Sequence, residues 1–175
     1  MKFGPDTLEL DAIDRQVLTE LQADAKISLK DIGEKVGLAA PSVMERVRKM
    51  EQAGIITGYH AVVDARSVGL DVAAFIGVSV RNHAVQTVEA FVLHEQQVLE
   101  CHHVTGRHTL MLKVKVRDTR SLEHLIGRIR SIDGVERTET MVVLSSHTER
   151  VNLALELAEE EDDARGAKRI RRRAS

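Results

Sequence analysis

The chain has 175 residues, of which 43% are hydrophobic and 30% charged, and its formal net charge is −2. This composition is typical of a soluble globular protein that forms one medium domain or two small ones. The slight negative charge argues against a protein that coats nucleic acid non-specifically, because that mode of binding requires many phosphate contacts. No stretch approaches the roughly 18 uncharged apolar residues of a membrane span, and the start, MKFGPDTLELD, does not resemble a secretion signal. A cytoplasmic location without a membrane partner is therefore expected.

Three helices are predicted in the first third of the chain. Apolar residues at helical spacing predict the first helix from Leu10 to Ala23. The second helix follows Ser28, whose side chain can cap it, and stops at Gly37, which permits a left-handed turn. The third helix runs from Pro41 to Gly54, with the proline in its first turn, where the missing N–H costs little. Three helices suffice for a small core, so residues 1–54 are predicted to form one domain.

The third helix has two distinct faces. Val43, Val47 and Met50 form an apolar stripe that predicts packing against the other two helices. The opposite face is polar and partly basic, which is typical of the second helix of a helix-turn-helix, the helix that enters the major groove of DNA. A merely solvated face is the alternative interpretation. The candidate DNA-binding residues are Ser42, Glu45, Arg46, Arg48 and Lys49.

These candidates can contact DNA in more than one way. Arg46 and Lys49 can read base edges or hold phosphates, and Ser42 can do either. Glu45 can accept a hydrogen bond from cytosine, or it can orient Arg46. The sequence leaves these roles open.

The segment after the helices is predicted to connect two domains. Residues Ile55 to Asp64, IITGYHAVVD, are rich in β-branched residues and alternate in polarity, which predicts an extended connector or a short strand. Residues 55–69 are therefore interpreted as a hinge, and residues 70–147 as the second domain.

The second domain is predicted to contain four strands and two helices. The strands are predicted at VAAFIGVSV, VLECHHVT, HTLMLKVKV and VERTETMVVL. One helix is predicted around Val85, Val88 and Val92 after the first strand, and another around Leu122, Leu125 and Ile129 after the third. The order β-α-β-β-α-β is that of a ferredoxin-like domain, an antiparallel sheet with both helices on one face. The fold class is thus α+β, with an N-terminal winged-helix or helix-turn-helix domain of three helices.

Residues 148–175 form a charged tail. Glu156 to Asp163 is an acidic run, and Arg165 to Arg173, RGAKRIRRR, is a basic run. Such blocks of like charge are usually solvated. The functional alternative is a basic arm that reaches DNA phosphates.

Short motifs in a fixed order relate the chain to a known family over residues 8 to 147. They are Leu10-Asp11 with Asp14, Leu18 and Leu21, Gly37-Leu38, Arg46-Val47, Gly54-Ile55-Ile56, Gly58-Tyr59, Gly69-Leu70, Val104-Thr105-Gly106, Gly134-Val135 and Thr140. In this order and spacing the chain resembles the Lrp/AsnC, or feast/famine, transcription regulators. The resemblance implies a DNA-binding helix-turn-helix, and a ferredoxin-like domain that dimerises and binds a small effector, usually an amino acid. It also implies that dimers associate further, commonly into octamers, with the effector between dimers.

The resemblance places the effector near the loop between the second and third strands. The candidate effector-binding residues are Thr105, Gly106, His108, Thr138, Thr140 and Met141. Gly106 and the threonines also have a purely structural interpretation. A tight hairpin needs a residue that can adopt a positive φ, such as glycine, and threonine is favoured in any β-strand.

Two positions depart from the family pattern. Ala39 stands where the family usually has a serine cap, and the third helix should lose about 1 kcal/mol of capping. His108 stands where the family has an aspartate that helps define the effector pocket, so the resemblance does not fix the effector of this chain.

Cysteine and histidine residues raise the question of a metal site. Cys101 is the single cysteine, which excludes an intramolecular disulfide and a four-thiolate zinc site, and it is expected to be a small buried hydrophobe. His102 and His103 follow it and His108 is close in sequence, but neighbouring residues of a strand point to opposite faces. No metal or cofactor is therefore expected, and His108 is favoured as an effector-contacting or pH-sensitive residue. A metal- or pH-responsive regulator that uses His108 is the alternative.

Three classes of function compete for this sequence. An enzyme is disfavoured because the chain has no nucleophile elbow, Walker loop or HExxH motif, and no catalytic residue is predicted. An architectural, nucleoid-type protein would bind DNA with weak sequence preference. The favoured interpretation is a homodimeric or larger regulator in the cytoplasm, associated with the nucleoid. It would bind a pseudo-palindromic operator, and its effector would shift the population of assemblies.

Overall fold

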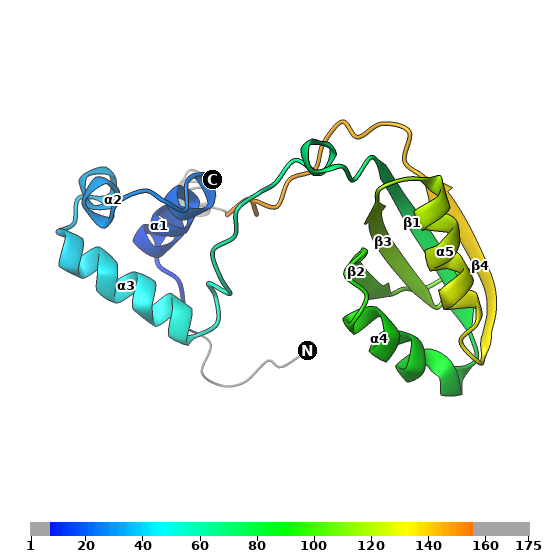
Figure 1. Ribbon diagram of the computed structural model, residues 1–175. Helices are drawn as coiled ribbons and strands as arrows, with labels where there is room; N and C mark the ends of the chain where they lie inside the picture. The colour runs from blue at the N-terminus through cyan, green and yellow to red at the C-terminus, as the bar shows by residue number, and fades with distance from the viewer. Residues whose placement is uncertain (1–7, 156–175) are drawn as a thin grey trace, which may run out of the picture. The chain divides into compact units, whose positions relative to one another are not determined.

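The computed structural model describes residues 8–155, which form two compact units (Figure 1). The first unit contains the described residues up to Ala61 together with those from Arg150 onward. The second unit comprises Val62–Glu149. The acidic and basic runs of the tail lie outside the described residues.

The first unit consists of three helices, α1 (Ala12–Ala23), α2 (Leu29–Val36) and α3 (Ala40–Gln52). The predicted caps are confirmed for α2, because the Ser28 hydroxyl accepts a hydrogen bond from the Asp31 amide and Gly37 adopts a left-handed φ of 71°. The α3 helix begins after Ala39, which provides no side-chain cap, as expected. The three predicted helices are therefore present, and their ends differ from the prediction by one or two residues.

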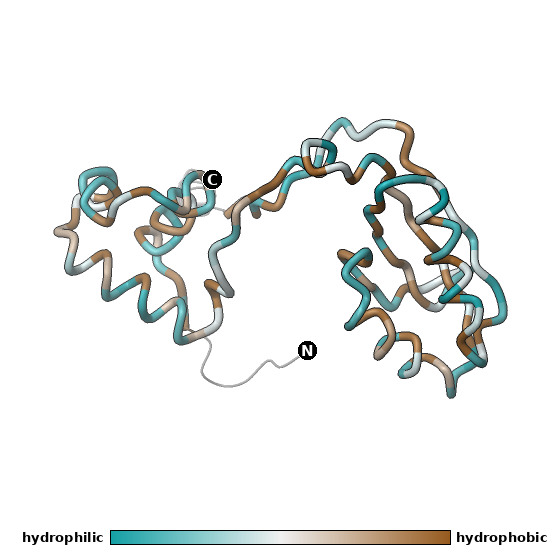
Figure 2. The backbone as a smooth tube through the Cα atoms, in the orientation of Figure 1, coloured by the Kyte–Doolittle hydropathy of each residue, from teal (hydrophilic) through white to brown (hydrophobic). Residues whose placement is uncertain are grey.

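A small apolar core joins these helices. The stripe predicted on α3 is buried, and α1 and α2 supply its partners. The buried core residues are Val17, Leu18, Ile32, Val43, Val47 and Met50. Hydrophobic positions recur between hydrophilic ones along each helix in Figure 2, as expected for helices that bury one side.

The connector has no strand. Between α3 and the first strand of the second unit, the structure has extended and turn residues and one short 3-10 helix, Arg66–Val68. Of the two alternatives for residues 55–64, the extended connector is the one observed. In the described part of the chain, α3 is thus followed by no strand that could form a wing.

The second unit has the predicted βαββαβ order. Its elements are β1 (Val72–Val80), α4 (Val85–Leu93), β2 (Val98–His103), β3 (Leu110–Val116), α5 (Thr119–Arg130) and β4 (Val135–Val142). The sheet order is β2-β3-β1-β4, and all neighbouring strands are antiparallel. Residues of α4 and α5 share one core with one face of the sheet, so both helices cover the same face.

The other sheet face, which we call the open face, carries every second residue of each strand. On β1, Ile76 and Val78 are buried beneath the helices, and the residues between them point to the open face. The register extends this assignment to the neighbouring strands. The open-face residues of β1, β3 and β4 are Ala73, Phe75, Gly77, Ser79, Met111, Lys113, Lys115, Arg137, Glu139 and Met141.

Cys101 departs from its predicted environment. It lies on β2, which is an edge strand because it pairs only with β3, and the thiol is exposed. The residues of β2 after Val98 are all exposed. The expectation that Cys101 is a buried hydrophobe is therefore wrong.

Candidate functional site

The solvent-exposed side of α3 carries most of the predicted DNA-binding residues. Ser42, Arg48 and Lys49 are exposed, and Glu45 is half-buried. They lie away from the buried stripe of Val43, Val47 and Met50, as a recognition helix requires. An open hollow next to α3 is lined by Leu8, Asp14, Pro41, Ser42, Glu45, Arg46 and Lys49.

Glu45 pairs with the exposed cations of its own helix. Its carboxylate accepts hydrogen bonds from Arg48 Nη2 at 2.9 Å and Arg48 Nε at 3.0 Å, and Lys49 Nζ lies 4.0 Å from Oε1. The fork of Arg48 and the carboxylate therefore form a two-point contact. In this structure the Glu45 carboxylate is held by Arg48, and Arg46 has other partners.

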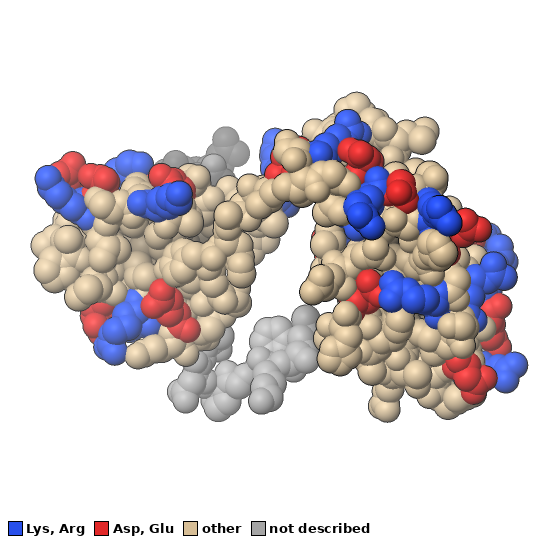
Figure 3. All heavy atoms as spheres, viewed as in Figure 1, with Lys and Arg blue, Asp and Glu red and all other residues tan. Residues whose placement is uncertain are grey.

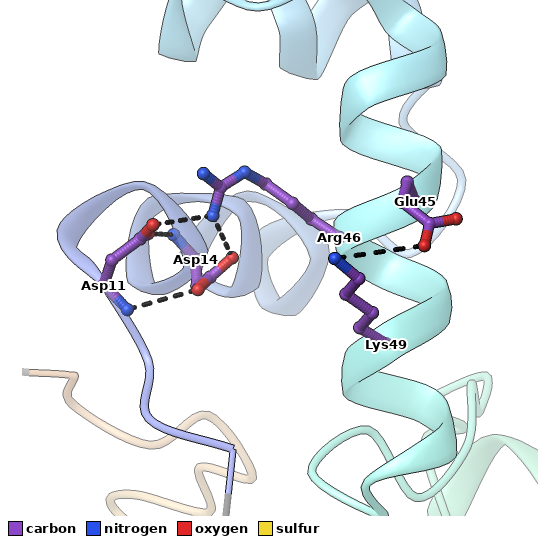
Figure 4. Close-up of polar contacts among 5 residues, drawn as sticks. All are labelled: Asp11, Asp14, Glu45, Arg46 and Lys49. Carbon is purple, nitrogen blue, oxygen red and sulfur yellow. Dashed lines mark hydrogen bonds and ion pairs between the residues drawn. The ribbon is translucent and has the colours of Figure 1, made fainter.

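Arg46 faces the first helix rather than solvent (Figure 4). Its Nη1 donates to Asp11 Oδ2 at 2.8 Å and to Asp14 Oδ1 at 2.6 Å. Asp14 is only 7% exposed and is the one buried charged residue in the described part of the chain. A single guanidinium nitrogen thus joins α3 to the beginning of α1.

The two aspartates also cap α1. The Asp11 carboxylate accepts from the Asp14 amide at 2.7 Å, and the Asp14 carboxylate accepts from the Asp11 amide at 3.1 Å, which completes a capping box. The amide of Asp14, followed by Arg46, lowers the pKa of Asp11, and the two carboxylates raise the pKa of Arg46. The cap and the ion pairs therefore stabilise the same charged arrangement.

The surface of the helical unit has mixed charge. Lys35 pairs with Glu20, and Lys30 lies 3.7 Å from Glu34. Blue and red side chains are interspersed on the face shown in Figure 3. A surface of mixed charge attracts the DNA phosphates less than a uniformly basic surface would. Specific contacts must therefore supply a larger share of the DNA-binding free energy than they would on a basic surface.

In the second unit, His108 is fixed on the open face. A Cβ added at Gly77 would lie 2.5 Å from His108 Cδ2, so the glycine makes room for the imidazole ring. His108 Nδ1 lies 3.4 Å from Ser79 Oγ, and its Nε2 lies 3.5 Å from Glu139 Oε2. The side chain is 9% exposed. The residue that departs from the family pattern is therefore packed against the sheet.

Glu139 lies among the side chains of Arg107, His108 and Arg137. It was not among the site residues predicted from the sequence. Besides His108, Arg107 Nη1 and Arg137 Nη2 lie 3.6 and 3.7 Å from its Oε2. That oxygen is buried but has no hydrogen-bond partner in the structure. We call Glu139 with these three residues the Glu139 cluster. Only the strand register, which sets Glu139 opposite Gly77, could have revealed it.

The six predicted effector residues do not gather in one place. Thr138 and Thr140 are opposite Val78 and Ile76, so they point toward the helices, whereas Met141 is opposite Phe75 on the open face. Thr105 and Gly106 are exposed in the loop between β2 and β3, where Gly106 has a φ of 111°. His108 and Met141 share the open face, and the two threonines do not.

A second polar hollow lies where the chain enters and leaves the sheet. Its charged or hydroxyl-bearing lining residues are Asp64, Arg66, Asp71, Lys115, Ser145, Ser146 and Glu149. Lys115 Nζ lies 2.9 Å from Glu149 Oε2. Within residues 8–155, no three His, Cys, Asp or Glu side chains are placed so that they could hold a metal ion.

Both halves of the chain match known domains. Residues 10–51 match the AsnC-type helix-turn-helix domain, and residues 73–153 match the Lrp/AsnC ligand binding domain. The chain is 32% identical over 146 residues to the HTH-type transcriptional regulator FL11 of Pyrococcus horikoshii, a match that covers 83% of this chain and 97% of that protein. The chain belongs to the Lrp/AsnC family.

Solved structures agree with this assignment. Escherichia coli AsnC superposes with a TM-score of 0.78 at 31% identity, covering 83% of this chain and 99% of AsnC. The Neisseria meningitidis regulator NMB0573, solved as a complex with L-Met, superposes with a TM-score of 0.80 at 28% identity, covering 83% and 97%. This Lrp/AsnC protein is thus a helix-turn-helix transcription regulator with a ligand-binding domain.

Family membership also decides between a regulator and an enzyme. The relatives are transcription regulators, so the regulator is confirmed over the enzyme. No helix in the described residues of this Lrp/AsnC protein is long and apolar enough to cross a membrane.

The Arg46 ion pairs predict a difference between two arginines of α3. Arg46→Ala leaves the buried Asp14 carboxylate without its cation, so the free energy of unfolding of the helical unit should fall by about 1–3 kcal/mol. Arg48→Ala breaks only the exposed pair with Glu45 and should cost less than about 1 kcal/mol. Chemical denaturation of the full chain, followed by helical circular dichroism, measures both values. Equal destabilisation by the two variants would contradict the structural role of Arg46.

Proposed function

We propose that this regulator binds a pseudo-palindromic DNA operator as a homodimer, and that a small effector in its second domain controls the binding. The observation that carries the proposal is the exposure of Ser42, Arg48 and Lys49 on α3, while the opposite side of that helix is buried. Two such helices related by a dimer axis would contact half-sites about one DNA turn apart. We place this activity in the cytoplasm, on the nucleoid.

The contacts within α3 support distinct roles for its cations. Arg48 and Lys49 extend toward solvent and are the residues that would reach base edges or phosphates. Glu45 holds the Arg48 fork until a DNA acceptor replaces it, or accepts from cytosine itself. Arg46 is already engaged by Asp11 and Asp14, so we assign it to positioning α3 rather than to reading bases.

The open face supports association of chains. Phe75 and Met141 lie opposite each other on it and are 38% and 45% exposed. Burial of such apolar area against a second copy is favourable by about 25 cal/mol per Å². Larger assemblies, including the octamer, follow from the family resemblance and are part of this proposal.

For the effector we propose an amino acid or a related metabolite. The Neisseria meningitidis regulator was solved with L-Met, and this chain shares its fold. We place the effector by the loop of Thr105 and Gly106, next to the Glu139 cluster. His108 stands where the family has an aspartate, and the Glu139 carboxylate is close enough to supply the negative charge for an ammonium group.

The threonines of β4 take a different part in this proposal. Thr138 and Thr140 point away from the Glu139 cluster, but β4 is an edge strand. A ligand that extends around this edge would reach both faces, with Met141 beside it on the open face and the two threonines at its other end. An architectural protein and a pH-sensitive regulator acting through His108 are the competing outcomes.

DNA binding is tested with an operator selected from random duplexes. Arg48→Ala and Lys49→Ala should each weaken operator binding by about 5-fold to 150-fold, the 1–3 kcal/mol of a specific contact. Arg130→Ala, which changes an exposed arginine of α5, is the control and should not change the affinity. Mobility-shift titrations at fixed salt measure the values.

If no sequence were enriched and the affinity fell steeply with salt, the architectural alternative would replace the proposal. Unchanged affinity for both α3 variants would remove this face of the helix from the DNA interface.

The effector is tested by thermal shift with a panel of amino acids. A ligand that binds the folded state raises the melting temperature, and Glu139→Gln should abolish the increase by removing the charge that holds the ammonium group. Glu136→Gln is the matched control, because Glu136 lies on the same strand, is exposed and pairs with Arg81. A ligand whose shift survives in Glu139→Gln would show that the Glu139 cluster is not the site. A DNA affinity that changes with pH in the wild type but not in a His108→Gln variant would favour the pH-sensitive alternative.

A further inference from the structure

Met44 is an exception to the burial of apolar side chains in the three helices. It is 55% exposed, whereas every other large apolar residue of α1, α2 and α3 is buried or half-buried. It belongs neither to the core of the helical unit nor to the residues packed against that core. Packing of the helical unit therefore does not account for an apolar side chain at this position.

Met44 shares one side of α3 with two other exposed residues. Pro41, Met44 and Arg48 are all exposed, and their spacing of i, i+3 and i+7 aligns them along the helix. We call these three residues the exposed stripe. Pro41 is in the first turn of α3, Met44 in the second and Arg48 in the third. The exposed stripe is thus apolar at the amino end of the helix and cationic further along it.

The uncapped polar side chains of α3 lie on another flank of the helix. Ser42 and Lys49 line the hollow beside α3, and Met44 does not. Around the helix axis, Ser42 and Lys49 are separated from Met44 by about 140–160°, at about 100° per residue. The solvent-exposed side of α3 is therefore divided into a polar flank and the exposed stripe.

The amino-terminal part of a recognition helix is the part that contacts base edges. In residues 40–44 of α3, the exposed side chains are those of Pro41, Ser42 and Met44. Only Ser42 carries a hydrogen-bonding group, so this part of the helix offers few polar contacts to bases. The C5 methyl of thymine is the apolar group that a base pair presents in the major groove. The exposed amino end of α3 therefore matches thymine better than any other base.

The methionine side chain suits such a contact. It is unbranched, it has three rotatable bonds and its thioether is polarizable, so it adapts to an irregular apolar surface. Single exposed apolar residues are common on protein surfaces, and exposure alone does not identify a contact. The position of Met44 is the second observation, because it lies one turn before Arg48 on the side of α3 proposed to bind DNA.

We propose that Met44 is a specificity-determining residue, which contacts the C5 methyl group of one thymine in each half-site of the operator. The proposal rests on the proposed function, since it requires α3 to lie in the major groove. Arg48 and Lys49 supply the polar contacts further along the helix. Met44 carries no charge, so it adds preference for a base without changing the number of phosphates that the protein neutralises.

The test uses the full chain and an operator selected from random duplexes. Each thymine of one half-site is replaced in turn by deoxyuridine, which lacks the C5 methyl group and keeps every hydrogen-bonding group of thymine. At one position the replacement should weaken binding by the wild type about fourfold, which corresponds to about 0.8 kcal/mol for one methyl-sized group. Mobility-shift titrations at fixed salt measure the affinities.

Two variants of Met44 separate an apolar contact from a general effect on α3. Met44→Leu stays apolar at similar volume and should keep the difference between thymine and deoxyuridine. Met44→Gln ends in a polar group and should bind the two duplexes with equal affinity. Gln52→Ala, which changes another exposed residue of α3, is the matched control and should keep the wild-type difference. The slope of log K against log salt should be the same for all of these proteins, because none changes a charge.

Each outcome decides the proposal. If no deoxyuridine replacement weakens binding while Arg48→Ala loses affinity, the role of Met44 is wrong and the proposed function stands. A thymine preference of wild-type size in Met44→Gln would also overturn it, because another residue would then read the methyl group. Loss of the preference in Gln52→Ala as well would show a general effect of changes in α3 and overturn the assignment to Met44. If the wild-type chain selects no operator, the proposed function fails and this proposal fails with it.

Discussion

The contact between Arg46 and the first turn of α1 determines where the DNA-binding helix lies. One guanidinium nitrogen donates to two carboxylates, and the same carboxylates cap α1. Because Asp14 is buried, its charge needs this cation, and α3 cannot rotate about its axis without separating them. The apolar stripe of α3 sets which side is buried, and the ion pairs set its angle against α1. The exposed positions of Arg48 and Lys49 follow from both.

The helices and strands could be predicted from the sequence because their signals are local. Helical spacing, the Ser28 cap and the Gly37 turn act over about four residues, and alternation assigns β1 and β3. Arg46 shows where local reasoning ends. It lies between Val43 and Met50 and borders the apolar stripe, but its aspartate partners are more than thirty residues away.

The effector region was less predictable for the same reason. The alternation along β4 places Thr138 and Thr140 on the same face, but which face is covered by helices depends on the pairing with β1. The Glu139 cluster combines residues from β4 and the β2–β3 loop against β1, and only the register brings them together. Cys101 required the sheet order, since hydrophobic character does not distinguish an edge strand from a central one.

The central claim is that Arg46 acts on DNA binding through Asp14, and a double-mutant cycle on operator affinity tests it most directly. Asp14→Asn keeps the size of the side chain and removes the charge that holds Arg46. If the claim holds, Arg46→Ala, Asp14→Asn and the double variant should weaken binding to a similar extent, because each releases the same restraint on α3. Additive effects, with Arg46→Ala costing as much in the Asp14→Asn background as in the wild type, would show a direct contact of Arg46 with DNA and contradict the claim.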